Sequence, residues 1–263
     1  MSTLSGRSAL VTGAGRGLGQ RAALRLASMG AKVALVARSQ SQLQETADLI
    51  ASTGGQSVVL PMDLGRLRSH EALQSAVIAA IGAPSVLVNA AGIFGPIALV
   101  RDTDPAAWID TILINTVSHY LTCRAFVGGM IDAGWGRIIN VTSAAALHPP
   151  GPINSAYGTS KAALNQFTRH LAAELIGTGV TANVIHPGDV KTEMWADIQA
   201  NAEKLGPEAA RYKEWAAWVE QTGGDDPEKA ADLIARIVGN DAADISGRFL
   251  WIEGGLQIPV ESW

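Results

Sequence analysis

Tyr157 and Lys161 are the first residues of this 263-residue chain whose types and spacing suggest chemistry. They lie four positions apart in a run, 155–176, whose apolar residues recur at helical spacing. Both side chains therefore leave the same face of a predicted helix. A free phenol has a pKa of about 10, but a neighbouring ammonium lowers it and makes tyrosine a usable general acid–base. The same spacing also occurs on ordinary helix surfaces, so its meaning depends on the rest of the chain.

A glycine-rich turn is the second candidate. The apolar run 8–12 is followed by Gly-Ala-Gly-Arg-Gly-Leu-Gly over 13–19, then by a helical pattern and a second apolar run over 31–37. This order predicts a strand–helix–strand unit with glycines at the turn into its helix. Such glycines let a pyrophosphate approach the backbone where free N–H groups and the helix dipole favour an anion. A merely tight turn is the structural alternative.

The composition favours one large, well-packed domain over 1–263. Hydrophobic residues make up 48% of the chain and charged residues 17%, which argues against a disordered protein. A net charge of −4 argues against a surface built for nucleic acid. The composition therefore suits a buried, well-packed enzyme that does not bind nucleic acid.

The compartment is expected to be the cytoplasm. Cys123 is the only cysteine, so no intrachain disulfide and no thiolate cluster can form, and no metal site is expected. The first residues, 1–7, carry no charged-then-apolar signal pattern, and no apolar run is long enough to cross a bilayer.

Two motifs together resemble one family. Thr12-Gly-x-x-x-Gly-x-Gly and Tyr157-x-x-x-Lys161 are typical of the shorter, single-domain branch of the short-chain dehydrogenase/reductase family. The resemblance covers nearly the whole chain and thins between Glu193 and Asp226. It implies an α/β fold: a single-domain, doubly wound (Rossmann-like) parallel sheet of about seven strands with helices on both faces. It also implies a site for NAD(H) or NADP(H), and a homo-oligomer, either a dimer or a tetramer.

The resemblance implies cofactor contacts at positions along the whole chain: Gly13, Arg16, Gly17, Leu18, Gly19, Arg38, Asp63, Leu64, Asn89, Ala90, Gly92, Tyr157, Lys161, Pro187, Gly188, Val190 and Thr192. Arg38 follows the second predicted strand where an NAD site would place a carboxylate. A guanidinium is the natural partner of a 2′-phosphate, so NADP(H) is favoured over NAD(H). Surface arginines at 16 and 38 and a loop or helix-capping acid at Asp63 are the alternatives, and Asn89 is also expected to tie neighbouring strands.

The catalytic set implied by the family is Asn115, Ser143, Tyr157 and Lys161. Ser143 would hold the substrate oxygen, Tyr157 would exchange its proton, and Asn115 would support a water beside Lys161. A satisfied core amide is the alternative for Asn115. The predicted activity is NADP(H)-dependent interconversion of a carbonyl and a secondary alcohol. A non-catalytic NADP(H)-binding regulator or scaffold is the rival, as is an epimerase or dehydratase of the longer family branch.

The segment 189–226 is expected to cover the substrate. It mixes aromatic residues with charges, and Trp215 and Trp218 are three positions apart on a predicted helix. Alternatively, or in addition, the aromatic residues dock this segment on the body of the protein. The residues expected to line the substrate pocket are Phe94, Leu147, Trp195, Trp215 and Trp218. These residues do not identify the substrate.

Overall fold

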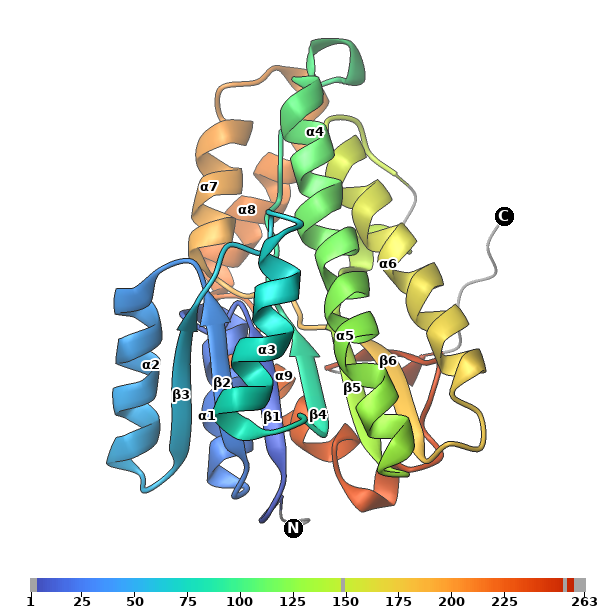
Figure 1. Ribbon diagram of the computed structural model, residues 1–263. Coiled ribbons are helices and arrows are strands. Elements are labelled where there is room, and N and C mark those ends of the chain that lie inside the picture. Colours follow the sequence, from blue (N-terminus) through green and yellow to red (C-terminus); the bar gives the residue numbers. More distant parts are fainter. Residues whose placement is uncertain (1–3, 148–149, 253–254, 258–263) are drawn as a thin grey trace.

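The central feature of the fold is a sheet covered by helices on both faces, seen in a computed structural model that describes residues 4–147, 150–252 and 255–257 (Figure 1). Its strands are β1 Ser8–Thr12, β2 Lys32–Ala37, β3 Gln56–Pro61, β4 Val86–Asn89, β5 Gly136–Val141, β6 Val180–His186, β7 Phe249–Trp251 and β8 Gly255–Gln257. The strand order is β3-β2-β1-β4-β5-β6-β7-β8. Strands β1 to β7 pair in parallel, which confirms the predicted doubly wound sheet.

Strand β8 is an addition that the sequence did not predict. It pairs antiparallel with β7. The turn expected at 253–255 lies mostly outside the described residues.

Nine α-helices are found in the described part of the chain: α1 Gly17–Ser28, α2 Gln40–Ser52, α3 Ser69–Ile81, α4 Pro105–Ile112, α5 Ser118–Asp132, α6 Ser155–Glu174, α7 Glu193–Ala202, α8 Ala210–Thr222 and α9 Pro227–Ile237. The helix expected around 108–121 is instead α4 and α5 joined by a π-helical turn, Leu113–Val117. Asn115 lies in that turn. Such turns often occur at functional sites. No helix of the described residues is both long and apolar enough to span a bilayer.

The sheet separates two apolar cores, because successive strand side chains point to opposite faces. Ala9 and Val11 of β1 pack with residues of α1, α2 and α9, whereas Leu10 packs with residues of α3, α5 and α6. The middle strands are thus buried on both sides, as their continuous apolar runs predict.

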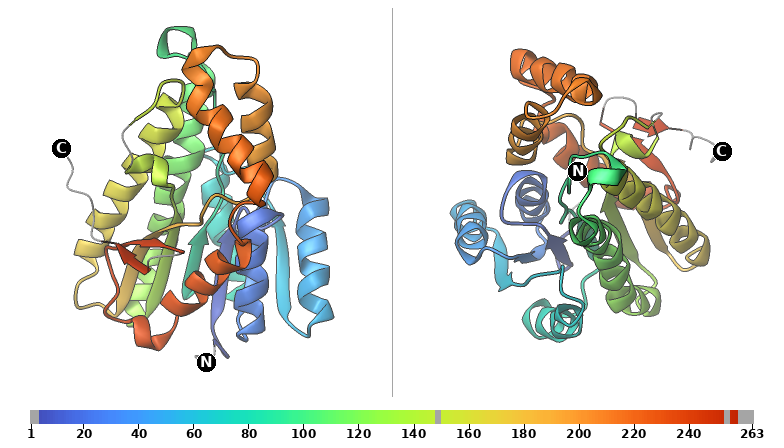
Figure 2. Two further views of the ribbon diagram at one scale, coloured as in Figure 1. Left: turned by 180° about the vertical axis from the view of Figure 1, so that it is seen from behind. Right: turned by 90° about the horizontal axis from the view of Figure 1, so that it is seen from above.

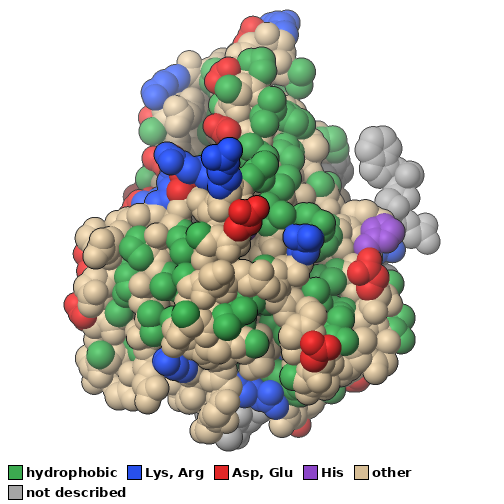
Figure 3. Space-filling model, in the orientation of Figure 1, with side chains coloured by type: hydrophobic (Ala, Val, Ile, Leu, Met, Phe, Trp, Pro, Cys, Tyr) green, Lys and Arg blue, Asp and Glu red, His purple; other side chains and the backbone are tan. Residues whose placement is uncertain are grey.

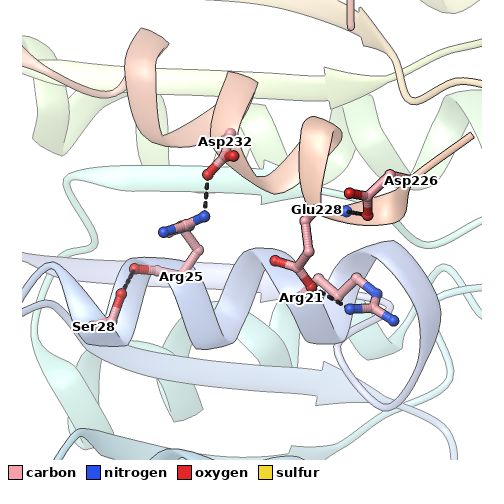
Figure 4. Close-up of polar contacts among 6 residues, drawn as sticks. All are labelled: Arg21, Arg25, Ser28, Asp226, Glu228 and Asp232. Carbon is pink, nitrogen blue, oxygen red and sulfur yellow. Dashed lines mark hydrogen bonds and ion pairs between the residues drawn. The ribbon is translucent and has the colours of Figure 1, made fainter.

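Helix α1, which follows the glycine turn, is fixed against α9 (Figure 4). Arg21 pairs with Glu228, and Arg25 pairs with Asp232. These exposed pairs are each worth at most about 1 kcal/mol. Most of the stabilisation comes from the buried side chains between the helices, among them Leu26 and Ile234. The glycine turn is therefore anchored by packing within the main core.

Helices α7 and α8 lie above the carboxyl ends of the strands (Figures 1 and 2). The two ends of their segment are joined. Val190 forms an antiparallel bridge with Gly224, and the Asp225 carboxylate accepts a hydrogen bond from the Asp189 N–H at 2.7 Å. The segment 189–226 is thus a closed loop of two helices that rests on the edge where the strands end.

Candidate active site

A cavity of about 960 Å³ lies at the carboxyl ends of the strands, where the strand order reverses between β1 and β4. Ligands of doubly wound sheets bind at this switch point. The cavity wall includes most of the predicted residues: Gly13, Arg16, Gly17, Leu18, Gly19, Arg38, Asp63, Leu64, Ala90, Gly92, Ser143, Tyr157, Lys161, Pro187, Gly188, Val190 and Thr192. Asn89 and Asn115 are buried behind it.

The glycine turn forms one end of the cavity. Gly13 and Gly17 have φ values of 68° and 55°, in the left-handed region that favours glycine. A Cβ at Gly13 would lie 2.8 Å from the carbonyl group of Ala90, and a Cβ at Gly19 would collide with the Gly13 carbonyl oxygen. The turn and the end of β4 therefore touch through their backbones.

The N-terminus of α1 lies at this turn, and its N-cap residue, Arg16, makes no side-chain capping hydrogen bond. Its first N–H groups and its dipole favour an anion. A Cβ at Gly17 would meet no atom within 4 Å, so there is room beside the backbone. This end of the cavity fits the pyrophosphate of a dinucleotide.

The two arginines predicted for a 2′-phosphate differ in their surroundings. Arg16 is paired with Glu193 at the start of α7. Arg38 is exposed, and none of the ion pairs in the described part of the chain involves it. Asp63 also lines the cavity, but its carboxylate accepts from the Gly65 N–H at 3.1 Å and pairs with Arg66 at 3.3 Å. These contacts match the alternative interpretation of Asp63, in which it is an acid of the loop.

Ser143, Tyr157 and Lys161 meet at the middle of the cavity. Ser143 follows β5, and its side chain hydrogen-bonds that of Tyr157. Lys161 is 4% exposed, donates to the Val141 carbonyl at 2.9 Å and lies 5.7 Å from the Tyr157 ring centroid. The end of β5 and the first two turns of α6 thus hold the three groups together, as the predicted helix spacing requires.

Burial is the largest influence on the pKa values of both titratable groups. It raises the pKa of Tyr157 to about 12, against the hydrogen bond with Ser143, which lowers it. It lowers the pKa of Lys161 to about 7. The phenol is therefore neutral near pH 7, while the amine loses its proton far more readily than an exposed lysine does. The expectation that Lys161 lowers the pKa of Tyr157 is wrong for this structure, because burial raises that pKa and Lys161 is not among the groups that shift it.

Asn115 and His119, one helical turn apart, hold the two ends of the segment 89–93. The Asn115 side chain accepts from the Ile93 N–H at 2.9 Å and donates to the Ile93 carbonyl at 2.8 Å. His119 Nε2 lies 3.1 Å from the Asn89 carbonyl oxygen, and burial and the charge of Lys161 lower the His119 pKa to about 3, so a neutral ring donates there. The side chain of Asn89 donates to Asn140 of β5 at 2.9 Å, the expected tie between strands.

The Asn115 amide has the hydrogen bonds of a satisfied core amide. It also donates to the Ser160 hydroxyl at 3.0 Å. Its role in supporting a water beside Lys161 stays a prediction. What the structure adds is that Asn115 positions the cavity wall 90–93.

The wall after β6 is shaped by the ends of the α7–α8 segment. Gly188 has a φ of 85°, and a Cβ there would lie 2.9 Å from the Asp225 Cβ. Thr192 caps α7, accepting from the Trp195 N–H at 3.3 Å. The predicted contacts of Pro187, Gly188, Val190 and Thr192 with a nicotinamide stay predictions, although all four line the cavity.

Aromatic side chains form the other end of the cavity. The Phe94 ring stacks on Tyr157 with 4.6 Å between centroids and meets Tyr212 of α8 edge-on at 5.9 Å. Trp195 and Trp215 also line this end, as predicted. The segment 189–226 therefore contributes to the wall, and its covering role stays a proposal.

Two pocket predictions were wrong: Leu147 and Trp218 are not on the cavity wall. Trp218 is 45% exposed. Three positions rotate a helix by about 300°, so Trp215 and Trp218 leave α8 in directions about 60° apart. This rotation places Trp215 on the cavity side of α8 and Trp218 on its solvent side.

Several polar residues of the cavity wall were not predicted from the sequence. Asn154 and Tyr212 are two of them. His119 was missed as well, although its place four residues after Asn115 could have suggested a shared face. For Asn154, the only available signal was its position three residues before Tyr157.

Comparisons with known proteins identify relatives of this chain. The profile of the short chain dehydrogenase family matches residues 7–203. A 3-oxoacyl-[acyl-carrier-protein] reductase of Pseudomonas aeruginosa is 33% identical over 264 residues, 97% of this chain and 99% of the relative. A short chain dehydrogenase of Pseudocercospora fijiensis is 37% identical over 199 residues, and the alignment covers 75% of this chain and 64% of that relative.

Solved structures show the same fold. A metagenomic short-chain oxidoreductase in complex with NADP superposes with a TM-score of 0.76 at 31% identity, covering 95% of this chain and 97% of the other. An NAD⁺-bound xylitol dehydrogenase superposes with a TM-score of 0.86 at 26% identity, covering 96% and 99%. The protein therefore belongs to the short-chain dehydrogenase/reductase family of oxidoreductases, which act on carbonyl and alcohol groups.

Proposed function

We propose that this protein is an NADP(H)-dependent oxidoreductase that interconverts a carbonyl and a secondary alcohol, with Tyr157 as the general acid–base. The observation that carries the proposal is one continuous cavity. It joins the glycine turn at one end to Ser143, Tyr157 and Lys161 in its middle. A dinucleotide held at the turn would extend toward the tyrosine, so that the substrate would occupy the aromatic end.

The proton chemistry follows from the side chains. A bound nicotinamide dinucleotide supplies or accepts the hydride. Ser143 donates a hydrogen bond to the substrate oxygen and stabilises the charge that develops there. Tyr157, neutral near pH 7 because burial raises its pKa, donates its proton to that oxygen in the reducing direction. Lys161 lies beside the phenol and orients it while the proton is resupplied from the Asn115 side of the cavity.

Arg38 supports the preference for NADP(H). Its exposed guanidinium follows β2, where the chain has no carboxylate for a ribose hydroxyl. A guanidinium binds phosphate through two parallel hydrogen bonds. One structural relative is described as an NADP complex, and another as NAD⁺-bound. The proposal for this chain therefore depends on Arg38 rather than on its relatives.

A homo-oligomer in the cytoplasm is also part of the proposal. Apolar side chains gather over α4 and α5 on one face of the molecule (Figure 3). Ile109, Tyr120 and Ile131 of these helices are 53%, 45% and 41% exposed. Exposed apolar patches of this kind often mark protein interfaces. Sedimentation of the purified protein tests the assembly, and a monomer at micromolar concentration would contradict it.

Turnover tests the chemistry. Nicotinamide absorbance is followed across a panel of ketones and secondary alcohols with both cofactors, for the wild type and for Tyr157→Phe. We expect turnover that favours NADP(H) and falls at least about 10³-fold in the variant, because the proton donor is lost. Cofactor binding, measured by fluorescence titration, should change little. Retained turnover in Tyr157→Phe would contradict the mechanism, and tight binding without any turnover would favour a regulator.

A further inference from the structure

The loop after β5 carries Ser143, and the hydrogen bonds of its backbone N–H groups can be followed one by one. The Ala146 N–H donates to the Ser143 carbonyl at 3.1 Å. The Leu147 N–H donates to the Ala144 carbonyl at 2.9 Å. The Ala145 N–H donates to the Ser143 hydroxyl oxygen at 3.2 Å. These three bonds close a short 3₁₀ turn on itself, whereas the Ala144 N–H, the first of the turn, donates outside it.

A side chain of the neighbouring strand is the acceptor for this N–H. His186 is the last residue of β6, and its Nδ1 accepts from the Ala144 N–H at 3.2 Å. An imidazole nitrogen that accepts carries no proton, so the ring is neutral and its proton is on Nε2. The ring is 6% exposed and lies edge-on to Trp251 of β7, with 4.8 Å between the centroids. Packing against the sheet thus fixes the position of this acceptor.

The contact with His186 continues the pairing of β5 with β6 beyond the ends of the two strands. The Thr142 N–H donates to the Ile185 carbonyl at 2.8 Å, which is still a bond between two backbones. Two residues later, the ring of His186 replaces the backbone as the acceptor. Ser143 therefore lies between two residues that are both bonded to β6. Its hydroxyl takes part in neither bond and lies on the cavity wall with Tyr157.

The direction of the Ser143 hydroxyl depends on these two bonds. A donor stabilises charge on a substrate oxygen only when it points to the place where that charge develops. A displacement of roughly 1 Å can lower the rate about 100-fold. If the ring of His186 were absent, the half-buried Ala144 N–H would have to turn toward another acceptor, since an N–H without a partner is unfavourable. That turn would rotate the peptide that follows Ser143 and move its hydroxyl.

We propose that His186 is a positioning residue for the reaction: its Nδ1 holds the Ala144 N–H and thereby directs the Ser143 hydroxyl toward the substrate oxygen. The inference rests on the proposed function and deepens it. It adds a residue of β6 to a set that otherwise comes from the end of β5, from α6 and from the π-helical turn. His186 acts through Ser143 and takes no part in the proton transfer itself.

Three substitutions at this position separate the hydrogen bond from packing. In asparagine the acceptor oxygen is bonded to Cγ, as Nδ1 is in histidine, whereas the oxygen of glutamine is one bond further out. We expect the kcat of His186→Asn to lie within about threefold of the wild type, and that of His186→Gln and His186→Leu to fall at least about tenfold. Packing alone predicts the reverse order for the two amides, because glutamine fills more of the space of the imidazole. That reverse order would overturn the proposal.

A second mutation shows whether His186 acts through Ser143. Ser143→Ala alone should lower kcat about 100-fold, since the donor to the substrate oxygen is lost. In that background, His186→Leu should change kcat by less than about twofold further, because no hydroxyl is left to position. His170→Leu, the same exchange at an exposed site of α6, is the matched control and should leave kcat unchanged in both backgrounds. Losses that multiply in the double variant would overturn the proposal.

Amide hydrogen exchange, followed by NMR, tests the positioning without turnover. The Ala144 N–H reports on the bond to the ring, and the Ala145 N–H reports on the place of the Ser143 hydroxyl. His186→Gln should speed exchange at both alanines at least about tenfold, whereas His186→Asn should not. The Thr142 N–H, bonded to the β6 backbone, is the internal reference and should keep its wild-type rate in both variants.

The exchange rates also distinguish the two proposals from each other. Faster exchange at Ala144 alone would mean that Ser143 keeps its place without the ring, which would overturn the positioning role. If both alanines respond as expected but no ketone is turned over, the positioning stands and the proposed activity fails. If ketones are turned over and the variants match the wild type in rate and exchange, the activity stands and the positioning fails.

Discussion

The two ends of the cavity differ in the groups that line them. The glycine end is made of backbone: the turn 13–19 touches the Ala90 carbonyl, and the proposed site for the pyrophosphate consists of backbone N–H groups. The aromatic end is made of side chains from separate segments, with Phe94 after β4, Asn154 before α6, and Tyr212 and Trp215 on α8. A backbone site suits a ligand that many relatives share. A side-chain site can change its ligand by substitution without altering the fold.

The two ends also differ in how they are anchored. Helix α1 belongs to the large core on one face of the sheet, whereas Ala202 and Ala209 of the α7–α8 segment form a small cluster with Ile153. The bridge between Val190 and Gly224 and the pair between Lys191 and Glu220 lie within the segment, whereas the exposed pair between Glu193 and Arg16 joins it to the glycine turn. Regions with few buried apolar contacts open at lower free energy. We therefore expect faster amide exchange in 193–222 than in α1.

Among the changes that compare the two ends of the cavity, Lys161→Met should have the largest effect, because Lys161 lies where the two ends meet. We expect turnover to fall at least about 100-fold, since the phenol loses its neighbouring amine. The stability should rise. Burial lowers the Lys161 pKa from 10.5 to about 7, so between these pH values the unfolded chain binds a proton that the folded protein does not. The free energy of unfolding therefore decreases as pH falls through this window.

Thermal unfolding from pH 10 to pH 7 measures this linkage. The variant should lack that part of the pH dependence, and at pH 7 its Tm should exceed the wild-type value by about 2–4 °C, which corresponds to about 1 kcal/mol. Lys191→Met is a matched control, because Lys191 is 41% exposed. If the Tm of Lys161→Met depends on pH as strongly as that of the wild type, the buried amine is not the source of this pH dependence.

Gly19→Ala tests whether the glycine end depends on close backbone contact. The added Cβ would collide with the Gly13 carbonyl oxygen, so the turn must shift. We expect the Kd for NADP(H), measured by fluorescence titration, to rise at least about tenfold, because the N–H groups move away from the pyrophosphate. Gly128→Ala is the control: a Cβ there meets nothing within 4 Å, and α5 should become slightly more stable. Unchanged affinity in Gly19→Ala would contradict the backbone site.

The same difference between the two ends explains what the sequence could predict. Glycine spacing and buried apolar runs report on backbone geometry, so the doubly wound sheet and the turn 13–19 were predicted correctly. The pair Tyr157 and Lys161 was predictable because one helix fixes its spacing. Asn154 and Tyr212, whose side chains hydrogen-bond, meet only through the path of the α7–α8 segment, and Ile153 carries no signal of its φ of 67°. The outward turn of Trp218 likewise depends on how α8 docks, which its sequence does not specify.

Arg38→Asp should have a smaller effect, confined to cofactor choice. The exchange removes the partner of a 2′-phosphate and installs an acceptor for a ribose hydroxyl. We expect the ratio of kcat/KM for NADPH to that for NADH to fall about tenfold. Arg16→Ala is the comparison: its guanidinium is already paired with Glu193, so its loss should change the ratio less. A larger effect of Arg16→Ala would assign the phosphate to the glycine turn instead.

Trp215→Ala and Trp218→Ala should give the smallest and most local difference. Trp215 lines the aromatic end, and its removal exposes apolar substrate surface to water; about 40 Å² corresponds to about 1 kcal/mol. We expect KM for an aromatic ketone to rise about fivefold, with the Kd for NADP(H) unchanged. Trp218, 45% exposed on the same helix, should leave KM within about twofold. Equal effects of the two changes on KM would mean that α8 acts only by docking on the body, because a covering helix must distinguish its cavity side from its solvent side.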